Sequence, residues 1–290
     1  MQLSVASGPG MGAVNEDIAL TGPDTVVVLD GVSVVPGGPP AGCAHSTSWY
    51  VRHLGARLMS LAAVDHSTSL TDVLSLAITG VNGLHDATCD LSREDGPAST
   101  VAMIRRRDDV LDYLVLSDSV LLLDCGEGGG SIRAITDDTG EQLARKHLRA
   151  VLDSHGLTGS TDLRGLADLT TVVAELQALY LRLRNRPGGY WVASALPRAA
   201  EHARTGTLPL GSVRQAALLS DGASRLVDPF GVLTWPALLQ VLRDEGPAAL
   251  IARTREAEMS DPECLRWPRF KRSDDATAVH VRFNDTGPPA

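Results

Sequence analysis

The sequence contains no block of lysine and arginine, and its basic residues are outnumbered by its acidic ones. There are 26 Lys and Arg against 35 Asp and Glu, which gives a formal net charge of -9. A surface that binds nucleic acid needs a basic groove that follows the phosphates. We therefore do not expect nucleic acid among the partners of this protein.

Long apolar runs are also missing. No run approaches the roughly 18 apolar residues that span a bilayer, and residues 1–12 lack both the basic and the apolar region of a secretory signal. We expect a soluble, cytoplasmic protein without a membrane partner. The sequence does not indicate an oligomeric state.

The four cysteines, Cys43, Cys89, Cys125 and Cys264, are scattered along the chain. None belongs to a Cys-x-x-Cys pair, so neither a disulfide framework nor a standard structural zinc site is indicated. Cys43, His45 and Cys89 are residue types that bind zinc, but their spacing matches no standard pattern. We therefore expect reduced thiols, most of them buried.

Apolar residues make up 43% of the 290 residues, which is enough to bury a substantial core. The sequence has no internal repeat and no polar linker that would divide it. We expect one domain over residues 1–290, with a helical insertion at about 137–186 and a flexible tail at about 284–290. In the insertion, apolar residues from Leu166 to Leu183 recur in threes and fours, which predicts a helical hairpin.

Short runs of β type alternate with stretches of helical spacing. Strands are predicted at residues 2–6, 18–20, 25–29, 99–104, 111–116, 120–124, 131–135, 190–193, 213–219 and 276–283. Helices outside the insertion are predicted at about 47–61, 70–84, 234–243 and 247–258. The four runs between residues 99 and 135 predict a meander of adjacent strands. Because strands lie before, between and after the helices, we expect an α+β fold with antiparallel sheets.

Acidic residues recur where apolar strands end. The run Thr25–Leu29 ends in Asp30 and then turns at Gly31. Similar positions are held by Glu16, Asp17, Asp118, Asp221, Asp274 and Asp275. Each acid alone is typical of an ordinary turn, and the last two could form a surface ion-pair cluster with Lys271 and Arg272.

Carboxylates from several segments suit Mg2+ and Mn2+, which prefer oxygen ligands. Two such ions can share one carboxylate, generate a hydroxide and hold a phosphoryl group for in-line attack. If the acids converge, phosphate ester hydrolysis is the natural reaction class.

The order of these motifs resembles that of the PPM family of metal-dependent Ser/Thr protein phosphatases (type 2C). The motifs are Asn15-Glu16-Asp17, Asp30-Gly31, Ala98-Ser99-Thr100, Ser117-Asp118-Ser119, Ser220-Asp221-Gly222 and Asp274-Asp275-Ala276-Thr277. The resemblance implies an α-β-β-α sandwich of two antiparallel sheets flanked by helices, with a dinuclear Mg2+/Mn2+ site and a bridging hydroxide between the sheets. The helical hairpin would be an addition to this sandwich.

The resemblance also implies a role for each acid. Asp30 would bridge the two ions, and the carbonyl oxygen of Gly31 would bind one of them. The remaining ligands would be Asp221 and Asp274 for the first ion, Glu16 and Asp17 for the second, and Asp118 for a possible third. Ser99 and Thr100 would be structural.

The chain departs from the family pattern at the phosphate-binding arginine, whose position is taken by Gly12. Nearby cations that could bind the substrate phosphate instead are Arg225, Arg269, Lys271 and Arg272. The loop after Gly31 is also altered, which could reshape substrate access. His45 is a candidate general acid for the leaving group, although we favour a histidine in the core or at the start of a helix.

Three functions remain open at this stage. The first is a phosphatase acting on phosphorylated Ser or Thr in proteins. The second keeps the chemistry but takes a small phosphorylated metabolite, as the change at Gly12 would allow. The third is a phosphatase-like module that senses or binds a partner with weak or no catalysis, against which the retained acids speak.

Overall fold

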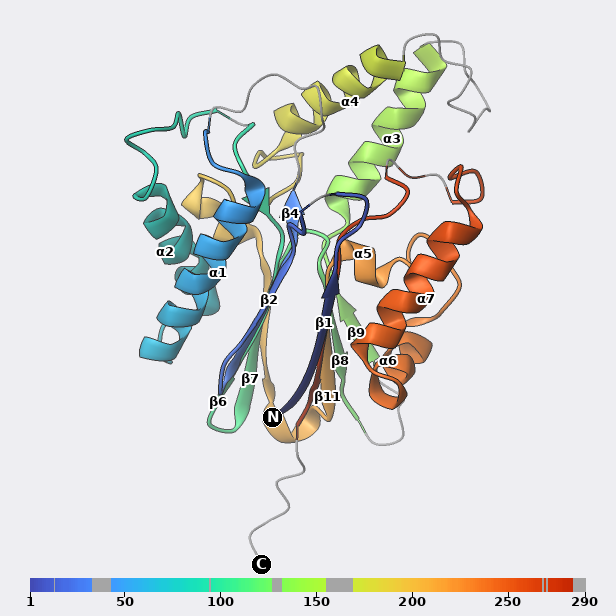
Figure 1. The fold of residues 1–290 in the computed structure, drawn as a ribbon. Helices are drawn as coiled ribbons and strands as arrows, with labels where there is room; N and C mark the ends of the chain where they lie inside the picture. The colour runs from blue at the N-terminus through green and yellow to red at the C-terminus, as the bar shows by residue number, and fades with distance from the viewer. Residues whose placement is uncertain are drawn as a thin grey trace, which may run out of the picture.

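A computed structural model describes residues 1–12, 14–32, 43–93, 95–126, 132–154, 169–267, 269 and 271–283. Two five-stranded antiparallel sheets pack face to face, with helices on both outer faces (Figure 1). Helices α1 (Thr47–Val64) and α2 (Leu70–Asn82) cover one sheet, and α6 (Trp235–Asp244) and α7 (Pro247–Ser260) cover the other. The predicted sandwich is confirmed.

Each sheet combines strands from distant parts of the chain. The first sheet has the order β10 (Arg204–Pro209), β7 (Val110–Leu116), β6 (Val101–Arg107), β3 (Thr25–Leu29) and β2 (Ile18–Thr21). The second has the order β1 (Gln2–Gly8), β12 (Ala276–Arg282), β11 (Gln215–Leu219), β8 (Val120–Asp124) and β9 (Ile132–Ile135). Two short strands, β4 (Gly31–Val32) and β5 (Ala98–Ser99), form a separate pair.

The alternation of side chains along β3 shows how the core is divided. Val26 and Val28 point into the space between the sheets, where they pack with residues such as Leu121 of β8. Val27 and Leu29 point the other way, towards α1 and α2. Because both faces of the strand are buried, its sequence is a continuous apolar run rather than an alternating one.

The predicted meander between residues 99 and 135 is wrong. β6 and β7 pair in the first sheet, but β8 and β9 pair in the second. Ser117, Asp118 and Ser119 therefore carry the chain from one sheet to the other, with Ser117 in a left-handed conformation (φ 69°). β8 is buried along its whole length, so its apolar run gives no sign of which sheet it joins.

Hydroxyl side chains cap the first two helices. Ser46 Oγ accepts the backbone N–H of Trp49 at 3.1 Å, and Ser69 Oγ accepts that of Asp72 at 3.1 Å. α2 ends at Asn82, two residues before the predicted end, and the side chain of Leu84 is 45% exposed. The predicted helices at 234–243 and 247–258 are confirmed by α6 and α7.

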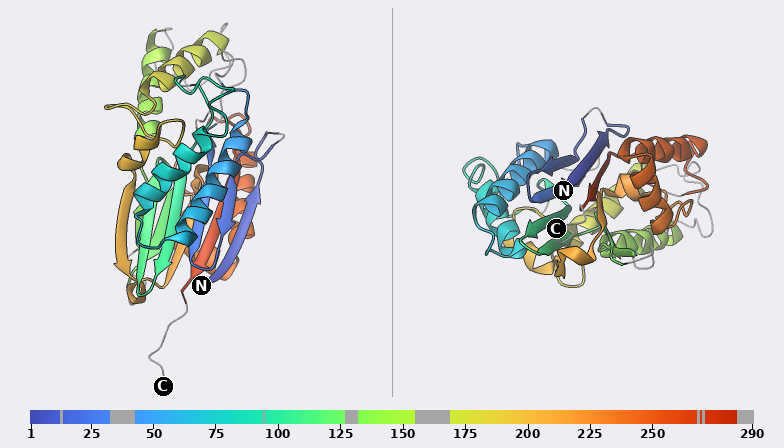
Figure 2. Two further views of the ribbon diagram at one scale, coloured as in Figure 1. Left: turned by 90° about the vertical axis from the view of Figure 1, so that its left-hand side faces the viewer. Right: turned by 90° about the horizontal axis from the view of Figure 1, so that it is seen from below.

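The insertion contains α3 (Thr139–Ser154) and α4 (Leu169–Leu183), which pack together above the strand ends (Figure 2). Tyr180 of α4 stacks on Tyr190, with ring centroids 4.2 Å apart. Leu166, part of the predicted apolar stripe, and the tail at 284–290 lie outside the described residues.

Two other sequence predictions need correction. Residues 190–193 make only isolated bridges, Arg184 with Tyr190 and Ser99 with Ala193, instead of a regular strand. β10 was not predicted, because as an edge strand it is largely exposed and lacks an apolar run. Within the described chain, we find no helix that is both long and apolar enough to cross a membrane.

Candidate metal and phosphate site

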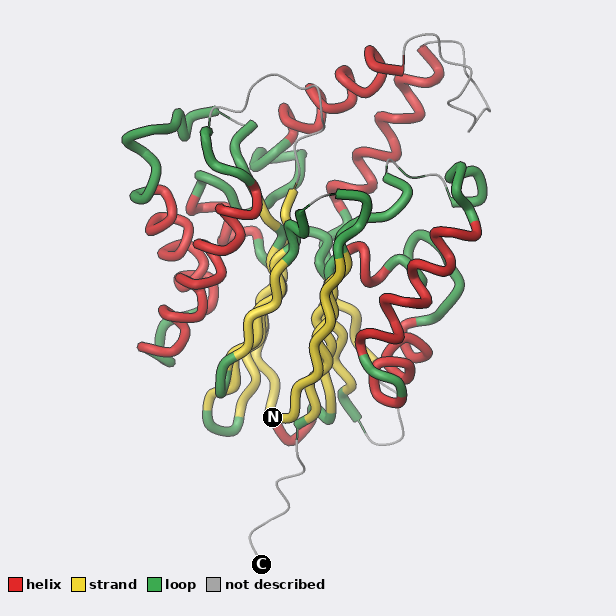
Figure 3. The backbone as a smooth tube through the Cα atoms, in the orientation of Figure 1, coloured by secondary structure: helices red, strands yellow, loops and turns green. Residues whose placement is uncertain are grey.

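The acidic loops gather at one end of the sandwich, the upper end in Figures 1 and 3. β3 leads to Asp30, β7 to Asp118, and β11 to Asp221, which opens the short helix α5 (Asp221–Ser224). β12 begins directly after Asp274 and Asp275. Both sheets therefore deliver acids to the same edge, although the residues are far apart in the sequence.

Asp30 is the centre of this cluster. Burial raises the pKa of Asp30 well above its usual value, and the negative charges of Asp17, Asp221, Asp274 and Asp118 raise it further. The backbone N–H of Asp221 donates to Asp30 Oδ2 at 3.3 Å. The structure thus brings together five of the predicted metal ligands.

Asp17 is a second buried acid of this cluster. Its side chain is buried, and neither carboxylate oxygen has a hydrogen-bond partner among the described residues. Burial raises the pKa of Asp17 to about 7 and the charge of Asp221 raises it further, while the nearby hydroxyls of Ser220 and Thr277 lower it. A buried carboxylate without donors is costly, so the donor set fits a divalent cation.

The backbone of Asp30 is fixed by the Ser99-Thr100 segment. Its carbonyl oxygen accepts the Thr100 N–H at 2.9 Å and the Ser99 hydroxyl at 3.0 Å. The Thr100 hydroxyl lies 2.5 Å from the Ser119 hydroxyl, which connects the same segment to the loop of Asp118. These contacts agree with the structural role that the resemblance implies for Ser99 and Thr100.

Asp274 and Asp275 have different neighbours. Asp274 pairs with Arg225 and with Lys271, both at 3.0 Å. Asp275 accepts the backbone N–H groups of Gly10 at 2.8 Å and Glu16 at 2.6 Å. Asp275 therefore holds the segment that carries Glu16, a role that the sequence did not reveal.

Two glycines allow the acidic segments to approach closely. A Cβ atom on Gly31 would lie 2.8 Å from the carbonyl oxygen of Glu16, and one on Gly222 would lie 1.9 Å from the carbonyl oxygen of Asp275. Side chains of any other type would separate these segments. Glycine after Asp30 and after Asp221 is thus required by packing.

The four candidate phosphate-binding cations differ in how strongly they are already paired with other groups of the protein. Arg225 is buried between Glu258 and Asp274. Arg269 pairs with Asp261 at 2.8 Å and donates to the carbonyl oxygens of Glu258, Asp261 and Trp267, contacts that hold the chain after α7. Lys271 and Arg272 are exposed, although Lys271 also pairs with Asp274 at 3.0 Å. Their exposure favours these two over Arg225 and Arg269, which are enclosed by protein groups.

Glu141, in the first turn of α3, is an acid that the sequence motifs missed. Burial raises the pKa of Glu141, Arg145 lowers it, and the charge of Asp221 raises it. For Asp118, burial raises the pKa to about 7, with contributions from Asp221 and Glu141. The insertion therefore adds a carboxylate to the edge of the cluster, and only the fold of α3 over the strand ends could have shown this.

His45 has thiols as its polar neighbours. Its Nδ1 lies 3.3 Å from Cys89 Sγ and 3.5 Å from Cys43 Sγ, and its ring packs on Trp49. These contacts do not favour the predicted role as general acid. They agree better with a histidine at the start of a helix, since α1 begins two residues later.

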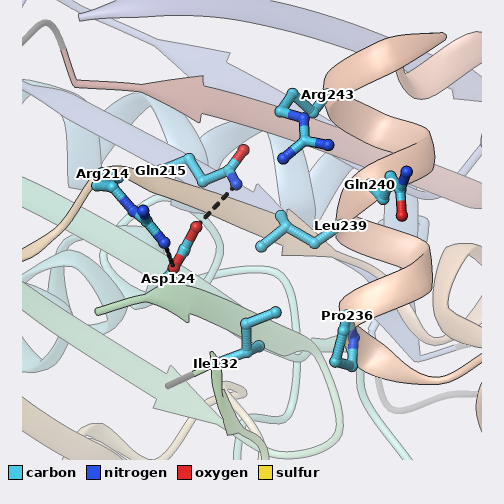
Figure 4. A pocket seen from close by; sticks show the side chains of 8 residues that line it. All are labelled: Asp124, Ile132, Arg214, Gln215, Pro236, Leu239, Gln240 and Arg243. Atoms are coloured by element: carbon cyan, nitrogen blue, oxygen red, sulfur yellow. Dashed lines mark hydrogen bonds and ion pairs between the residues drawn. The ribbon is translucent and has the colours of Figure 1, made fainter. Parts of the chain in front are cut away.

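A cavity of about 310 Å³ lies at the opposite end of the second sheet (Figure 4). Its acidic residue, Asp124, already pairs with Arg214 at 2.8 Å and with Gln215 at 2.9 Å. Because these polar groups satisfy one another and the acids of the cluster lie at the other strand ends, we do not connect this cavity with the chemistry.

No family model matches the sequence, and no curated protein matches it significantly. Solved structures do resemble the fold. The catalytic domain of the serine/threonine protein phosphatase PstP, in complex with two manganese ions, has 16% identity and a TM-score of 0.53, with 97% of each chain covered. The PPM Ser-Thr phosphatase MsPP from Mycobacterium smegmatis has 14% identity and a TM-score of 0.53, with 98% of each chain covered.

The serine/threonine phosphatase Stp1 from Staphylococcus aureus has 13% identity and a TM-score of 0.55 over 97% of this chain and 94% of its own. At such identities, the likeness concerns the fold. The chain thus has the fold of PPM phosphatases over almost its whole length, and the resemblance noted from the sequence motifs is confirmed at this level.

Proposed function

We propose that this chain is a metal-dependent phosphomonoester hydrolase whose main substrates are proteins phosphorylated on Ser or Thr. The convergence of Asp17, Asp118, Asp221 and Asp274 on Asp30 is the observation that carries the proposal. The fold of PPM phosphatases, including one described with two manganese ions, supports it. Carboxylates gathered in this way repel one another, and bound divalent cations would neutralise them.

The proposed ligands of two Mn2+ or Mg2+ ions are Glu16, Asp17, Asp30, the Gly31 carbonyl oxygen, Asp221 and Asp274, with Asp118 for a third ion. The two buried oxygens of Asp17 that lack donors fit such a role. When bound, the ions would supply Lewis acidity to activate water and to neutralise the charge of the phosphoryl group.

The residues of the chain itself position these groups. Ser99 and Thr100 hold the Asp30 backbone, and Asp275 holds the segment of Glu16. Arg225, paired with buried Glu258, orients Asp274. Lys271 and Arg272 are the exposed cations closest in sequence to Asp274, and we propose that they hold the substrate phosphate in place of the arginine missing at Gly12.

The test is hydrolysis of p-nitrophenyl phosphate and of phosphopeptides, with Mn2+ or with EDTA. We expect turnover with Mn2+ and none with EDTA, and we expect Asp30→Asn to lose at least 100-fold in kcat, in line with loss of an electrostatic catalytic contact. Asp244→Asn is the matched control, because Asp244 is exposed at the end of α6. Full turnover by Asp30→Asn would contradict the proposal.

A small phosphorylated metabolite is the second candidate substrate, and glycine at position 12 favours it. Comparison of kcat/KM on phosphopeptides with kcat/KM on a panel of phosphorylated metabolites separates the two substrates. A binding module without catalysis would show neither activity, and it would not bind Mn2+ in a calorimetric titration at millimolar concentrations.

A further inference from the structure

Four side chains of metal-binding type meet where α1 begins and α2 ends. Cys43 and His45 precede α1, and His85 and Cys89 follow α2. One ligand atom from each lies within 4.8 Å of all the others. Cys43 Sγ is 3.3 Å from His85 Nδ1 and 3.5 Å from His45 Nδ1, and Cys89 Sγ is 3.3 Å from His45 Nδ1.

We propose that Cys43, His45, His85 and Cys89 form a structural zinc site, separate from the acidic cluster. In a tetrahedral site with Zn–S about 2.3 Å and Zn–N about 2.0 Å, neighbouring S and N atoms lie about 3.5 Å apart. The observed S···N distances of 3.3–3.5 Å match this expected separation between ligand atoms. Two thiolates and two imidazoles form a set that selects zinc over Mn2+ or Mg2+, which prefer oxygen.

The residues around the four side chains hold the two imidazole rings in fixed positions. The side chain of His85 is 3% exposed, and its Nε2 has no hydrogen-bond partner in the described part of the chain, so its polar contact is through Nδ1 with the Cys43 thiol. Trp49 packs on both imidazoles, with ring centroids 4.1 Å from His45 and 5.1 Å from His85. These contacts fix the two rings beside the sulfurs.

Backbone groups hold the two sulfurs in place. The N–H of His45 points to Cys43 Sγ, and the N–H of Ala44 points to Cys89 Sγ, both at 3.4 Å. The N–H of Cys89 donates to the carbonyl oxygen of His85 at 2.9 Å, which forms one helical turn and brings these two side chains to one side. The ligands thus come in two local pairs, Cys-x-His and His-x3-Cys, joined by the packing of α1 on α2.

A closed site with four protein ligands stabilises structure and leaves no position for substrate. Here it would fasten the start of α1 to the end of α2. Thr47, the first residue of α1, packs against Gly31: its Cγ2 would lie 2.7 Å from a Cβ atom placed on that glycine. Zinc would therefore also fix the start of α1 beside the Asp30-Gly31 turn. This effect does not depend on the reaction proposed for the acidic cluster.

The experiment uses the full chain purified from zinc-supplemented medium, with metal content measured by mass spectrometry. We expect one zinc per chain. After removal of zinc under reducing conditions, we expect Co2+ to bind with the visible d–d and thiolate charge-transfer bands of a tetrahedral site. The oxygen ligands of the acidic cluster cannot produce these thiolate bands, so the result does not depend on the proposed phosphatase function.

Cys89→Ser should lose the zinc and the thiolate bands, and Cys264→Ser, which changes a thiol outside the cluster, should keep both. If Cys89→Ser fails to fold, thiol labelling of the wild type gives the answer, because zinc should protect two of the four thiols and its removal should release them. Wild-type protein without zinc and without cobalt–thiolate bands would overturn the proposal. A Cys43–Cys89 disulfide in the protein as purified under reducing conditions would do the same.

Discussion

Gly222 shows how single atoms hold the acidic cluster together. A methyl group in place of its hydrogen would lie 1.9 Å from the Asp275 carbonyl oxygen, so one of the two segments must move. Asp221 is the preceding residue in the chain, and Asp275 fixes the backbone at Glu16. The position of several proposed ligands thus depends on the absence of one Cβ atom.

We predict that Gly222→Ala lowers the free energy of unfolding by about 1–3 kcal/mol, a usual cost of overpacking, and lowers Mn2+-dependent activity at least tenfold. Urea denaturation and the phosphatase assay measure the two effects. Gly211→Ala is the control, because a Cβ at Gly211 meets no atom within 4 Å. Equal stability and activity of the two variants would show that the cluster tolerates the displacement.

Asp261 illustrates an acid whose role is structural. Burial alone would raise its pKa, but Arg269 and the backbone N–H groups of residues 265–267 lower the pKa of Asp261 to about 2. A carboxylate with a lowered pKa stabilises the folded state above pH 4, and this contribution is lost as the pH falls towards 2.

We therefore predict that Asp261→Asn lowers the free energy of unfolding by about 2 kcal/mol at pH 7, the order of a hydrogen bond to a charged group. The difference from wild type should shrink as the pH falls from about 4 to 2, since the wild-type carboxylate then becomes protonated. Denaturation curves at several pH values measure this, and a difference that stays constant down to pH 2 would argue against the ionised role.

At the level of residues, the sequence could predict the acids at strand ends, because each lies just before or just after a recognisable apolar run. It could not predict Asp275 as the holder of the Glu16 segment, since Asp274 and Asp275 are equivalent in the sequence pattern. From the sequence we considered Cys43, His45 and Cys89 together but missed His85, because only the packing of α1 on α2 brings His85 next to Cys43, 42 residues away.

Among the elements, α3 adds charged residues to the edge of the acidic cluster. Its first turn places Glu141 beside Asp221 and Asp118, and Arg145 of the same helix pairs with Asp228 after α5. The insertion is thus part of the rim of the candidate site, and it can influence both metal affinity and substrate access.

We predict that Glu141→Gln raises the Mn2+ concentration for half-maximal activity severalfold, because one negative charge near the cluster is removed. The unfolding midpoint should change little. Glu256→Gln on α7 removes the same charge at an exposed position, and it should leave the Mn2+ dependence unchanged. An unaltered Mn2+ dependence in Glu141→Gln would place α3 outside the metal site.

For the elements, apolar periodicity predicted most strands and the four outer helices. It failed where pairing with other strands decides whether a segment forms a strand and which sheet it joins. Nothing in the apolar runs of β7 and β8 indicates that they belong to different sheets, and the exposed edge strand β10 exists because it pairs with β7. Residues 190–193 have strand-like composition, but they find only single bridging partners.

Across the whole molecule, the two sheets present opposite ends with different chemistry. One end carries the converging carboxylates of a chain with net charge -9. At the other, Asp124 pairs with Arg214 and accepts a hydrogen bond from Gln215 (Figure 4). The sandwich therefore concentrates negative charge at one end, where, within the described chain, only Asp274 of the converging aspartates is paired with cations, Arg225 and Lys271. Such an excess of carboxylates suits the binding of divalent cations.

Calorimetric titration of the wild-type chain and of Asp30→Asn with Mn2+ tests this claim most directly. We predict that the wild type binds at least two Mn2+ per chain and that Asp30→Asn loses at least one of them, because Asp30 is the carboxylate on which the others converge. A wild-type protein that shows no Mn2+ binding at millimolar concentrations, or an Asp30→Asn variant that binds as the wild type does, would contradict the account.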